Sequence, residues 1–595
     1  MSGLVAATHA DELGWHVSET GLSAPIQPAA GALEGTMAEF VTLEQLAGKS
    51  LTTDEIACEL SRYSLDAVLI AIAGVLHGLF RHPEGMKVAE RDLVDLLPPP
   101  LQQRFRALPV SSPATDRVIT SPQAMLNLAK IALTRHEPAD GQLVSMPFAA
   151  ILVLGVAMAS HLERDMLEVE AYWDQPADLF VYMFANHNLY SNEDDAAQIA
   201  RARSLEHLRH EIDPERSRLY DEVFRSVTSA SPKAARLIAS SFWVGSQSGP
   251  ILSAEYGSNA VVSAEERTAA IATVATDPAT LKSLIEAEHK RLGAKAGELK
   301  GWAFNSFRQY PVVRLSDGRY LIIHPGFLVD HMFDFDYDRS VVWSFPEDED
   351  RSRFRTFRGS AHERLVGMSV DAIFPSSPLL SKRVWTDEEL KALWNGRHCD
   401  FLIDGGSAIL LIEVVSHPLN EKAVAGVSLQ AVDDEIQTMV ISKARQLDES
   451  VKALLAHEEN MLGAVSVASE RAIVPLVVAT SGFPWNLMSS RVVWRQLEAG
   501  GLLQQNRVKP LMVLDLKGVE AMESLAEEGN GVADMILRGI DAGHAGIGFE
   551  HLVIRQGASL RRPRRLDAWW PDEFRDMAEG FGFDPNDLYR PPEWG

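Results

Sequence analysis

A pair of carboxylates on two short apolar segments is the feature of this sequence best suited to chemistry. Asp400 opens an apolar run that ends at Asp404, and Glu413 falls late in the run from Ile409 to Val415. A carboxylate inside so apolar a segment is costly to bury unless a partner neutralises its charge. A divalent cation shared by the two residues would provide that partner, so Asp400 and Glu413 are candidate metal ligands.

The residues between the two runs, Asp404, Gly405 and Gly406, are typical of a tight turn. They predict a β-hairpin in which the two carboxylates stand on neighbouring strands. Mg²⁺ is commonly held by one or two carboxylates together with substrate phosphates. The pattern therefore predicts Mg²⁺, or Mn²⁺, as the cofactor.

This arrangement resembles the PD-(D/E)XK nuclease superfamily. Its members place an acidic residue on one strand and Glu-X-Lys on the next, and the preceding helix often carries another Glu. Asp400 corresponds to the first acid, Glu413 to the second, and Glu363, near the start of a predicted helix, to the helical Glu. The resemblance covers roughly residues 350 to 520. It implies a restriction-endonuclease-like fold and metal-dependent hydrolysis of phosphodiester bonds.

The chain departs from the superfamily pattern at the motif lysine, which is replaced by Val415. Side chains alternate along a strand, so Glu413, Val415 and His417 share one face. Valine cannot orient a water molecule or stabilise the charge of a pentavalent phosphorus. His417 could reach the metal from this face, although a histidine at a strand end before Pro418 is more typical of a capping or turn residue.

A replacement amine is predicted from helical periodicity. The segment from Val432 to Leu454 has an apolar stripe, and Lys443 falls on that stripe with Gln446 three residues later. Lysines moved from the strand to a helix occur within the superfamily, so Lys443 is the candidate catalytic lysine. Alternatively, Lys443 lies at the edge of the stripe and extends to water.

Arginines crowd the start of the predicted first helix of this domain, at Arg351, Arg353, Arg355, Arg358 and Arg364. They would suit contacts with the phosphates around a scissile strand. Arg355, Arg358, Arg364 and Gln446 are therefore the candidate substrate-binding residues. The alternative, slightly favoured, is that the arginines neutralise the acidic run 347–350.

The surrounding segments predict the domain that positions these residues. Helix and strand patterns alternate beyond residue 350, as in an α/β domain. The apolar segments Ile473–Thr480 and Lys509–Asp515 have the composition of buried strands in a mixed sheet. The predicted fold class is multidomain α plus α/β, with a mainly helical N-terminal half and a C-terminal mixed sheet flanked by helices.

Five parts are predicted along the chain. Residues 1–36 form a flexible lead, and residues 37–300 form one or more helical domains. Residues 301–350 hold a β-hairpin with an Asp317-Gly318 turn, followed by the acidic run as a solvated linker. The nuclease-like domain covers 351–520, and 521–595 is a C-terminal extension. The arginine-rich stretch 561–565 in that extension, followed by Trp569 and Trp570, could contact nucleic acid. The favoured interpretation is a surface loop that balances an acidic protein.

The composition limits the class of protein. A chain of 595 residues exceeds a single hydrophobic core, so several domains are expected. A net charge of -26 argues against a protein that coats nucleic acid, yet residues 351–520 carry 19 Lys and Arg against 20 Asp and Glu. Two cysteines and no visible secretory signal favour the cytoplasm. The uncharged segment 143–160 is predicted to be a buried core helix and not a membrane span.

These features favour a Mg²⁺-dependent nuclease whose catalytic residues are Glu363, Asp400, Glu413 and Lys443. Its expected substrate is nucleic acid, with DNA favoured over RNA. The helical half is expected to sense a protein partner or to restrain the nuclease. The layout is similar to that of large bacterial proteins with C-terminal nuclease-like domains, some of them linked to defence against phage. The competing hypothesis is a non-catalytic scaffold that kept the nuclease fold, in which Glu413 and Lys443 form a buried ion pair. A metabolic enzyme lacks support, because the chain has no phosphate-binding loop, dinucleotide fingerprint or nucleophile elbow.

Overall fold

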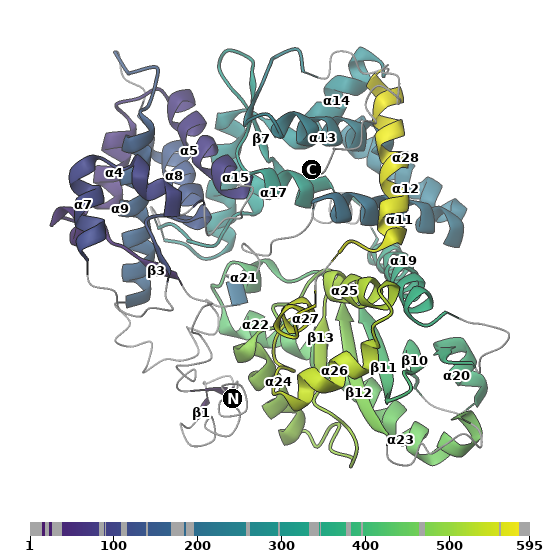
Figure 1. Ribbon diagram of the computed structural model, residues 1–595. Helices are drawn as coiled ribbons and strands as arrows, with labels where there is room; N and C mark the ends of the chain where they lie inside the picture. Colours follow the sequence, from purple (N-terminus) through teal and green to yellow (C-terminus); the bar gives the residue numbers. More distant parts are fainter. Residues whose placement is uncertain are drawn as a thin grey trace.

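The computed structural model has a mainly helical N-terminal half and a C-terminal half built on a five-stranded sheet, shown in the lower part of Figure 1. This confirms the expected division into a helical part and an α/β part. The structure describes residues 15–17, 23–25, 38–81, 89, 91–108, 116–137, 141–167, 184–185, 195–256, 262–295, 298–332, 344–345, 347–375, 382–393, 397–462, 471–558 and 561–581. Most of the predicted lead and the last part of the C-terminal extension lie outside these residues.

Several helices of the N-terminal half begin at side chains that cap them. Thr52 and Glu55 form a capping box at the start of one helix, and Ser263 caps another. The helices of this half are α3 (Leu43–Ala47), α4 (Thr53–Leu60), α5 (Leu65–Phe80), η1 (Leu93–Leu96), α7 (Pro99–Ala107), α8 (Pro122–Arg135), α9 (Phe148–Leu167), α11 (Asp195–Ile212), α12 (Pro214–Thr228), α13 (Pro232–Ser246), α14 (Ala264–Val274), α15 (Pro278–Arg291), α16 (Asn305–Gln309) and α17 (Pro325–Asp330).

The uncharged segment 143–160 leads into α9 and supplies most of it. Ile151, Leu152 and Val156 of this helix are buried against neighbouring helices. Across the described parts of the chain, no helix combines the length and the apolar character needed to cross a membrane. The expectation of a core helix is therefore confirmed.

Short strands accompany the helices of the N-terminal half. Two two-stranded sheets pair β1 (Trp15–Val17) with β2 (Ser23–Pro25) and β3 (Ala38–Phe40) with β4 (Asp116–Val118). The predicted hairpin is present as β7 (Val312–Arg314) and β8 (Tyr320–Ile322). It belongs to a four-stranded sheet in the order β5-β8-β7-β6, with β5 at Ile251–Leu252 and β6 at Ala275–Thr276.

The acidic run 347–350 is not a linker, and the predicted boundary there is wrong. Glu347 is the N-cap of α19 (Asp348–Ile373), and the next three acids form its first turn. Negative charge at a helix N-terminus is favourable. Arg351 and Arg353 pair with acids three and four residues earlier, at 2.8 Å from Asp348 and 2.5 Å from Glu349. These two arginines neutralise the acidic run, as the favoured interpretation held.

The C-terminal sheet has the strand order β13-β12-β11-β10-β9. Its strands are β9 (Val384–Thr386), β10 (Phe401–Asp404), β11 (Ala408–Val415), β12 (Ala472–Ala479) and β13 (Met512–Leu514). β10 is antiparallel to both of its neighbours, β9 and β11, whereas β12 and β13 continue the sheet in parallel with β11. The predicted hairpin and the two predicted buried strands are all present.

Helices cover both faces of this sheet. One face packs on α22 (Leu429–Glu435), the π-helical turn η4 (Ile436–Ile441), α23 (Ser442–Leu462) and α24 (Leu487–Ala499). The other face packs on α19, α25 (Leu516–Glu527), α26 (Val532–Asp541) and α27 (Phe549–Arg555). The short helices α20 (Asp387–Leu393) and α21 (Glu421–Val424) lie in connections. The core of this domain thus reaches Val553, well past the predicted end at residue 520.

The last described helix, α28 (Arg564–Phe581), runs back along the helical half, as the yellow helix of Figure 1 shows. Its arginine-rich start pairs with acids: Arg565 lies 3.0 Å from the fully buried Glu523 of α25. Further along, Glu573 is buried against Arg236 of α13. These contacts tie the two halves together and explain the basic cluster without a nucleic-acid ligand.

Candidate functional site

The β10–β11 hairpin brings the two predicted metal ligands to the same end of the sheet. Phe401 is opposite Ile412, so the next pair outward is Asp400 and Glu413. Directly opposed residues of an antiparallel pair point to the same face. The Asp400 carboxylate accepts a hydrogen bond from the Val414 backbone at 2.6 Å. The two acids therefore stand side by side at the carboxyl end of β11.

Glu413 is a buried acid that is only half satisfied. The residue is 1% exposed, and its Oε2 accepts a hydrogen bond from Lys443 Nζ at 2.8 Å. Its Oε1 has no hydrogen-bond partner among the residues that the structure describes. Burial, reinforced by the charge of Asp400, raises the pKa of Glu413 to about 8 despite the opposing effect of Lys443.

Lys443 points into this site and not to water. It is the second residue of α23, its side chain is 22% exposed, and Nζ also donates to Gln446 Oε1 at 3.1 Å. Val415, two residues after Glu413 on β11, is buried in the core between the sheet and α23. The helix thus presents an amine to Glu413 where the strand cannot.

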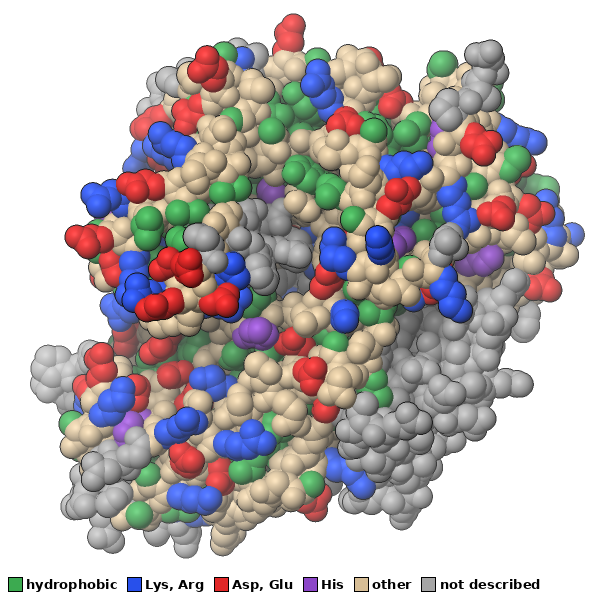
Figure 2. All heavy atoms as spheres, turned by 180° about the vertical axis from the view of Figure 1, so that it is seen from behind, with side chains coloured by type: hydrophobic (Ala, Val, Ile, Leu, Met, Phe, Trp, Pro, Cys, Tyr) green, Lys and Arg blue, Asp and Glu red, His purple; other side chains and the backbone are tan. Residues whose placement is uncertain are grey.

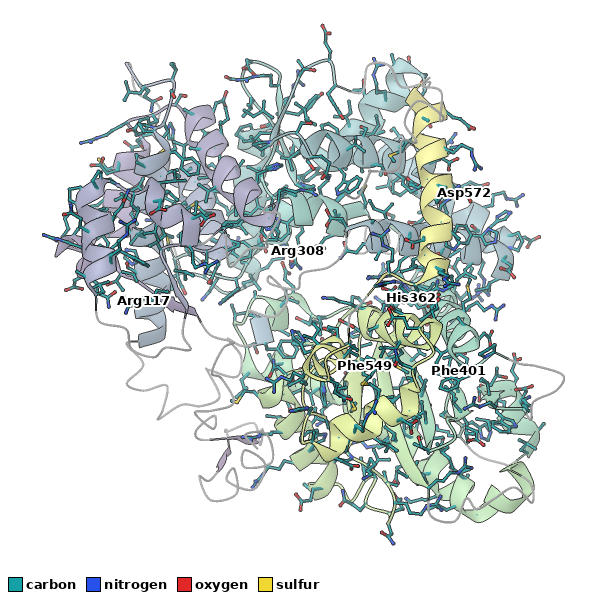
Figure 3. All side chains as sticks on the ribbon, viewed as in Figure 1. Arg117, Arg308, His362, Phe401, Phe549 and Asp572 are labelled. Carbon is teal, nitrogen blue, oxygen red and sulfur yellow. The ribbon has the colours of Figure 1, made fainter. Side chains whose placement is uncertain are left out.

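Glu363 approaches the same acids from α19. The charges of Asp400 and Asp387 add to burial and raise its pKa to about 7, while Lys443 lowers it. Gly367, one turn later, allows the helix to lie close to β10, because a Cβ there would lie 3.2 Å from the ring of Phe401. Figure 3 labels His362, the neighbour of Glu363, and Phe401 at this junction of α19 with the sheet.

Asp387 is a fourth acid, and the sequence reasoning missed it. It begins α20 between β9 and β10, and its backbone N–H donates to the Asp400 carbonyl at 3.0 Å. Its charge raises the pKa of Glu363, Asp400 and Glu413 alike. Lys391 Nζ lies 2.5 Å from its carboxylate. The sequence signal was only a cluster of acids opening a helix, and the strand order was needed to place it.

The structure does not gather the predicted substrate arginines at the acids. Arg355 and Arg364 lie on the solvent-exposed side of α19. Arg358 is 8% exposed and donates to Ser481 Oγ at 3.4 Å, beyond the end of β12. On the face opposite to that of Figure 1, basic and acidic side chains are interspersed and form no continuous basic surface (Figure 2). Gln446, the fourth predicted substrate contact, does touch a catalytic candidate, because it accepts the hydrogen bond from Lys443.

Within the described residues, no three His, Cys, Asp or Glu side chains are grouped closely enough to hold a metal ion by themselves. Mg²⁺ does not require such a group, because one or two carboxylates with substrate phosphates and water suffice. Asp400 and Glu413 meet that smaller requirement.

No protein-family model matches the sequence, and comparisons with curated proteins and with solved structures give no match. The function of the chain is therefore inferred from its own geometry.

Proposed function

We propose that the C-terminal half is a metal-dependent nuclease that hydrolyses phosphodiester bonds. The observation that supports this most strongly is the charge of the site. The pKa values of Glu363, Asp400 and Glu413 are all raised, mainly by burial and by one another or by Asp387. The ammonium of Lys443 stands among them, and that of Lys391 lies 2.5 Å from Asp387. Such clusters of perturbed groups are typical of functional sites.

The surplus of acids separates this proposal from a purely structural ion pair. A buried lysine needs one carboxylate, and Glu413 already provides it at 2.8 Å. Asp400 and Glu363 add further acidic groups in a poorly solvated place, where burial raises the pKa of both. Since unpaired buried charge is costly, their presence favours a site that takes up a cation.

The residues present fit a divalent cation of the Mg²⁺ or Mn²⁺ class. The carboxylates of Asp400 and Glu413 are hard oxygen ligands, and the unpartnered Oε1 of Glu413 is a buried acceptor that lacks a donor in the described chain. These two residues would hold the ion. When bound, it would polarise the phosphate that is attacked.

The side chains around the acids have separate proposed roles. Hydrolysis forms a bond between phosphorus and a water oxygen and breaks the bond to the leaving oxygen, which takes up a proton. Glu363, with a pKa of about 7, can accept the proton of the attacking water near neutral pH. Lys443 stabilises the negative charge that develops on the phosphate. Gln446 fixes the direction of the Lys443 ammonium through the contact at 3.1 Å.

A non-catalytic scaffold with this fold is the second candidate. The short contact between Lys443 and Glu413 and the apolar Val415 favour it, because both satisfy a packed core without substrate. Metal titration separates the two, since only a ligand of the native state stabilises that state. The scaffold predicts no thermal shift with Mg²⁺ or Mn²⁺.

Cleavage assays on DNA and RNA with the full chain test the proposal and decide between the two substrates. We expect Mg²⁺-dependent cleavage by the wild type and its loss in Asp400→Asn and Glu413→Gln. Glu449→Gln is the matched control, because Glu449 is an exposed acid on the same helix as Lys443. Equal cleavage by the wild type and both site variants would exclude these acids. If the wild type shows neither cleavage nor a metal-induced thermal shift, the non-catalytic scaffold is the function that remains.

A further inference from the structure

Two acid–base contacts, and not one, connect the end of β11 with the helix that follows. The first joins Glu413 to Lys443 at 2.8 Å. The second joins His417, just beyond the strand, to Glu435 at the end of α22, with 3.5 Å between Nε2 and Oε2. His417 lies four residues after Glu413, whereas its partner Glu435 lies eight residues before Lys443. The two contacts therefore lie one after the other along the strand and the helix.

The π-helical turn η4 aligns Glu435 and Lys443 on one side of the helix. Eight residues of an α-helix turn by about 800°, which would leave Glu435 and Lys443 roughly 80° apart around the axis. Ile436–Ile441, between them, is π-helical, and each residue there turns by roughly 80–85° in place of about 100°. The six residues remove roughly 90–120°, so both side chains face the strand. Such turns are rare and occur frequently at functional sites.

Glu435 is buried deeply for an acid that meets so exposed a partner. Its side chain is 5% exposed, whereas that of His417 is 48% exposed. Oε1 accepts a hydrogen bond from the Asn420 backbone at 3.1 Å. Oε2 has no hydrogen-bond donor within the described chain and faces only the imidazole at ion-pair distance. Glu435 thus holds both ends of the turn from His417 to Asn420.

A capping role alone does not account for this arrangement. Capping the turn requires the single bond from Asn420 to Oε1, and an amide side chain would supply the same acceptor. A second buried carboxylate oxygen without a polar partner costs free energy, and the imidazole Nε2 of His417 lies 3.5 Å from Oε2. Glu435 therefore fixes the position of this imidazole at the surface, on the side of the sheet where Lys443 stands.

We propose that His417, positioned by Glu435, is a second substrate contact that binds a backbone phosphate of the nucleic acid away from the scissile bond. This inference rests on the nuclease function proposed above. Glu435 and Lys443 are eight residues apart, which corresponds to a rise of roughly 10–12 Å along the helix. That separation corresponds to about three nucleotide steps of roughly 3.4 Å in a duplex strand. His417 consequently sets a minimum length of substrate on one side of the cleaved bond.

A length series of oligonucleotides, extended step by step on either side of one cleavable bond, tests the proposal. We expect His417→Gln to raise KM at least about tenfold for substrates that reach the His417 contact, because a hydrogen bond to a charged group is lost. kcat should remain at the wild-type value, and substrates too short to reach His417 should show no difference. Glu435→Gln should give the same dependence on length, since it acts through His417.

His551→Gln is the matched control, because His551 is also exposed and lies 3.6 Å from an acid, Glu550. The control should leave KM unchanged at every length. Cleavage by wild type and His417→Gln with equal KM on all lengths would overturn this inference and leave the nuclease proposal standing. A fall in kcat that is the same for all lengths, with a lowered Tm, would assign His417 a structural role and also overturn it. A wild type that cleaves nothing would overturn the nuclease proposal together with this one.

Discussion

Replacing Glu413 with glutamine tests whether the candidate site is destabilised by its own negative charge. The pKa of Glu413 is about 8, against an ordinary value of 4.5. Between these values the folded protein keeps a proton on the carboxyl that the unfolded chain releases. Stability must therefore fall as the pH rises through this window, and the loss is complete above about pH 8.

The size of the effect follows from the width of the window. The difference between about 8 and 4.5 corresponds to roughly 5 kcal/mol at about 1.4 kcal/mol per pH unit, and this is a ceiling. Glutamine has no proton to release, so the variant lacks this pH dependence. Without metal, we expect the two proteins to differ little near pH 5. Near pH 8.5 the variant should be more stable by about 2–5 kcal/mol.

Amide hydrogen exchange along β11 is the suitable assay. The chain has several hydrophobic cores, so its global unfolding does not yield one free energy. Local exchange in EDTA, corrected for the intrinsic dependence of exchange on pH, gives the opening free energy of the strand itself. Adding Mg²⁺ should stabilise the wild type near pH 8.5 and leave Glu413→Gln almost unchanged.

Parallel pH profiles of the opening free energy for the wild type and Glu413→Gln would refute this reasoning, because they would show that ionisation of the buried carboxyl does not destabilise the strand. The exposed-acid variant Glu449→Gln should follow the wild-type profile. A control that lost the pH dependence as well would attribute the effect to the helix and not to the site.

Three further changes have expected outcomes. Lys130 is fully buried, and burial lowers its pKa to about 7. The stability of the wild type should therefore rise between about pH 7 and 10.5. Lys130→Met should remove that rise, measured as the Tm in thermal denaturation. Arg565→Ala leaves Glu523 buried without this partner and should lower the opening free energy of α28 by about 3–5 kcal/mol, measured by amide hydrogen exchange. Arg561→Ala is the control, and because its side chain is 78% exposed it should lower that free energy by less than about 1 kcal/mol. Val415→Lys gives β11 a Glu-X-Lys sequence but puts an ammonium into a packed core, so we expect a lowered Tm and no gain in cleavage. Higher activity would contradict the role proposed for Lys443.

The arrangement of Glu413 and Lys443 could be predicted because both depend on short-range periodicity. Alternation along a strand assigns a face to Glu413, and the 3.6-residue repeat places Lys443 on the apolar stripe of its helix. The glycine turn at 405–406 then fixes the hairpin. Each of these signals lies within a few residues of the side chain that it positions.

The features that could not be predicted depend on contacts between distant segments or on unusual backbone. Asp387 reaches the site only because β9 pairs with β10, which acids at a helix start do not reveal. The π-helical turn η4 changes the face on which Glu435 lies, and its apolar residues look like those of any buried helix. The acidic run 347–350 is different, because its helix could be predicted from the sequence. Acids followed three and four residues later by arginines are a pattern typical of a helix.

The two halves of the chain share the parts that carry the site. The first turns of α19 pack on the helical half, where Phe354 stacks on Tyr220 of α12 with ring centroids 5.3 Å apart. The same helix carries Glu363 and then covers the sheet. On the strand side, Glu421, just past the His417 turn, lies 2.9 Å from Arg291 of α15. A shift of the helical half would therefore move Glu363 and the end of β11 together. This physical connection makes the helical half a frame that fixes the geometry of the candidate site.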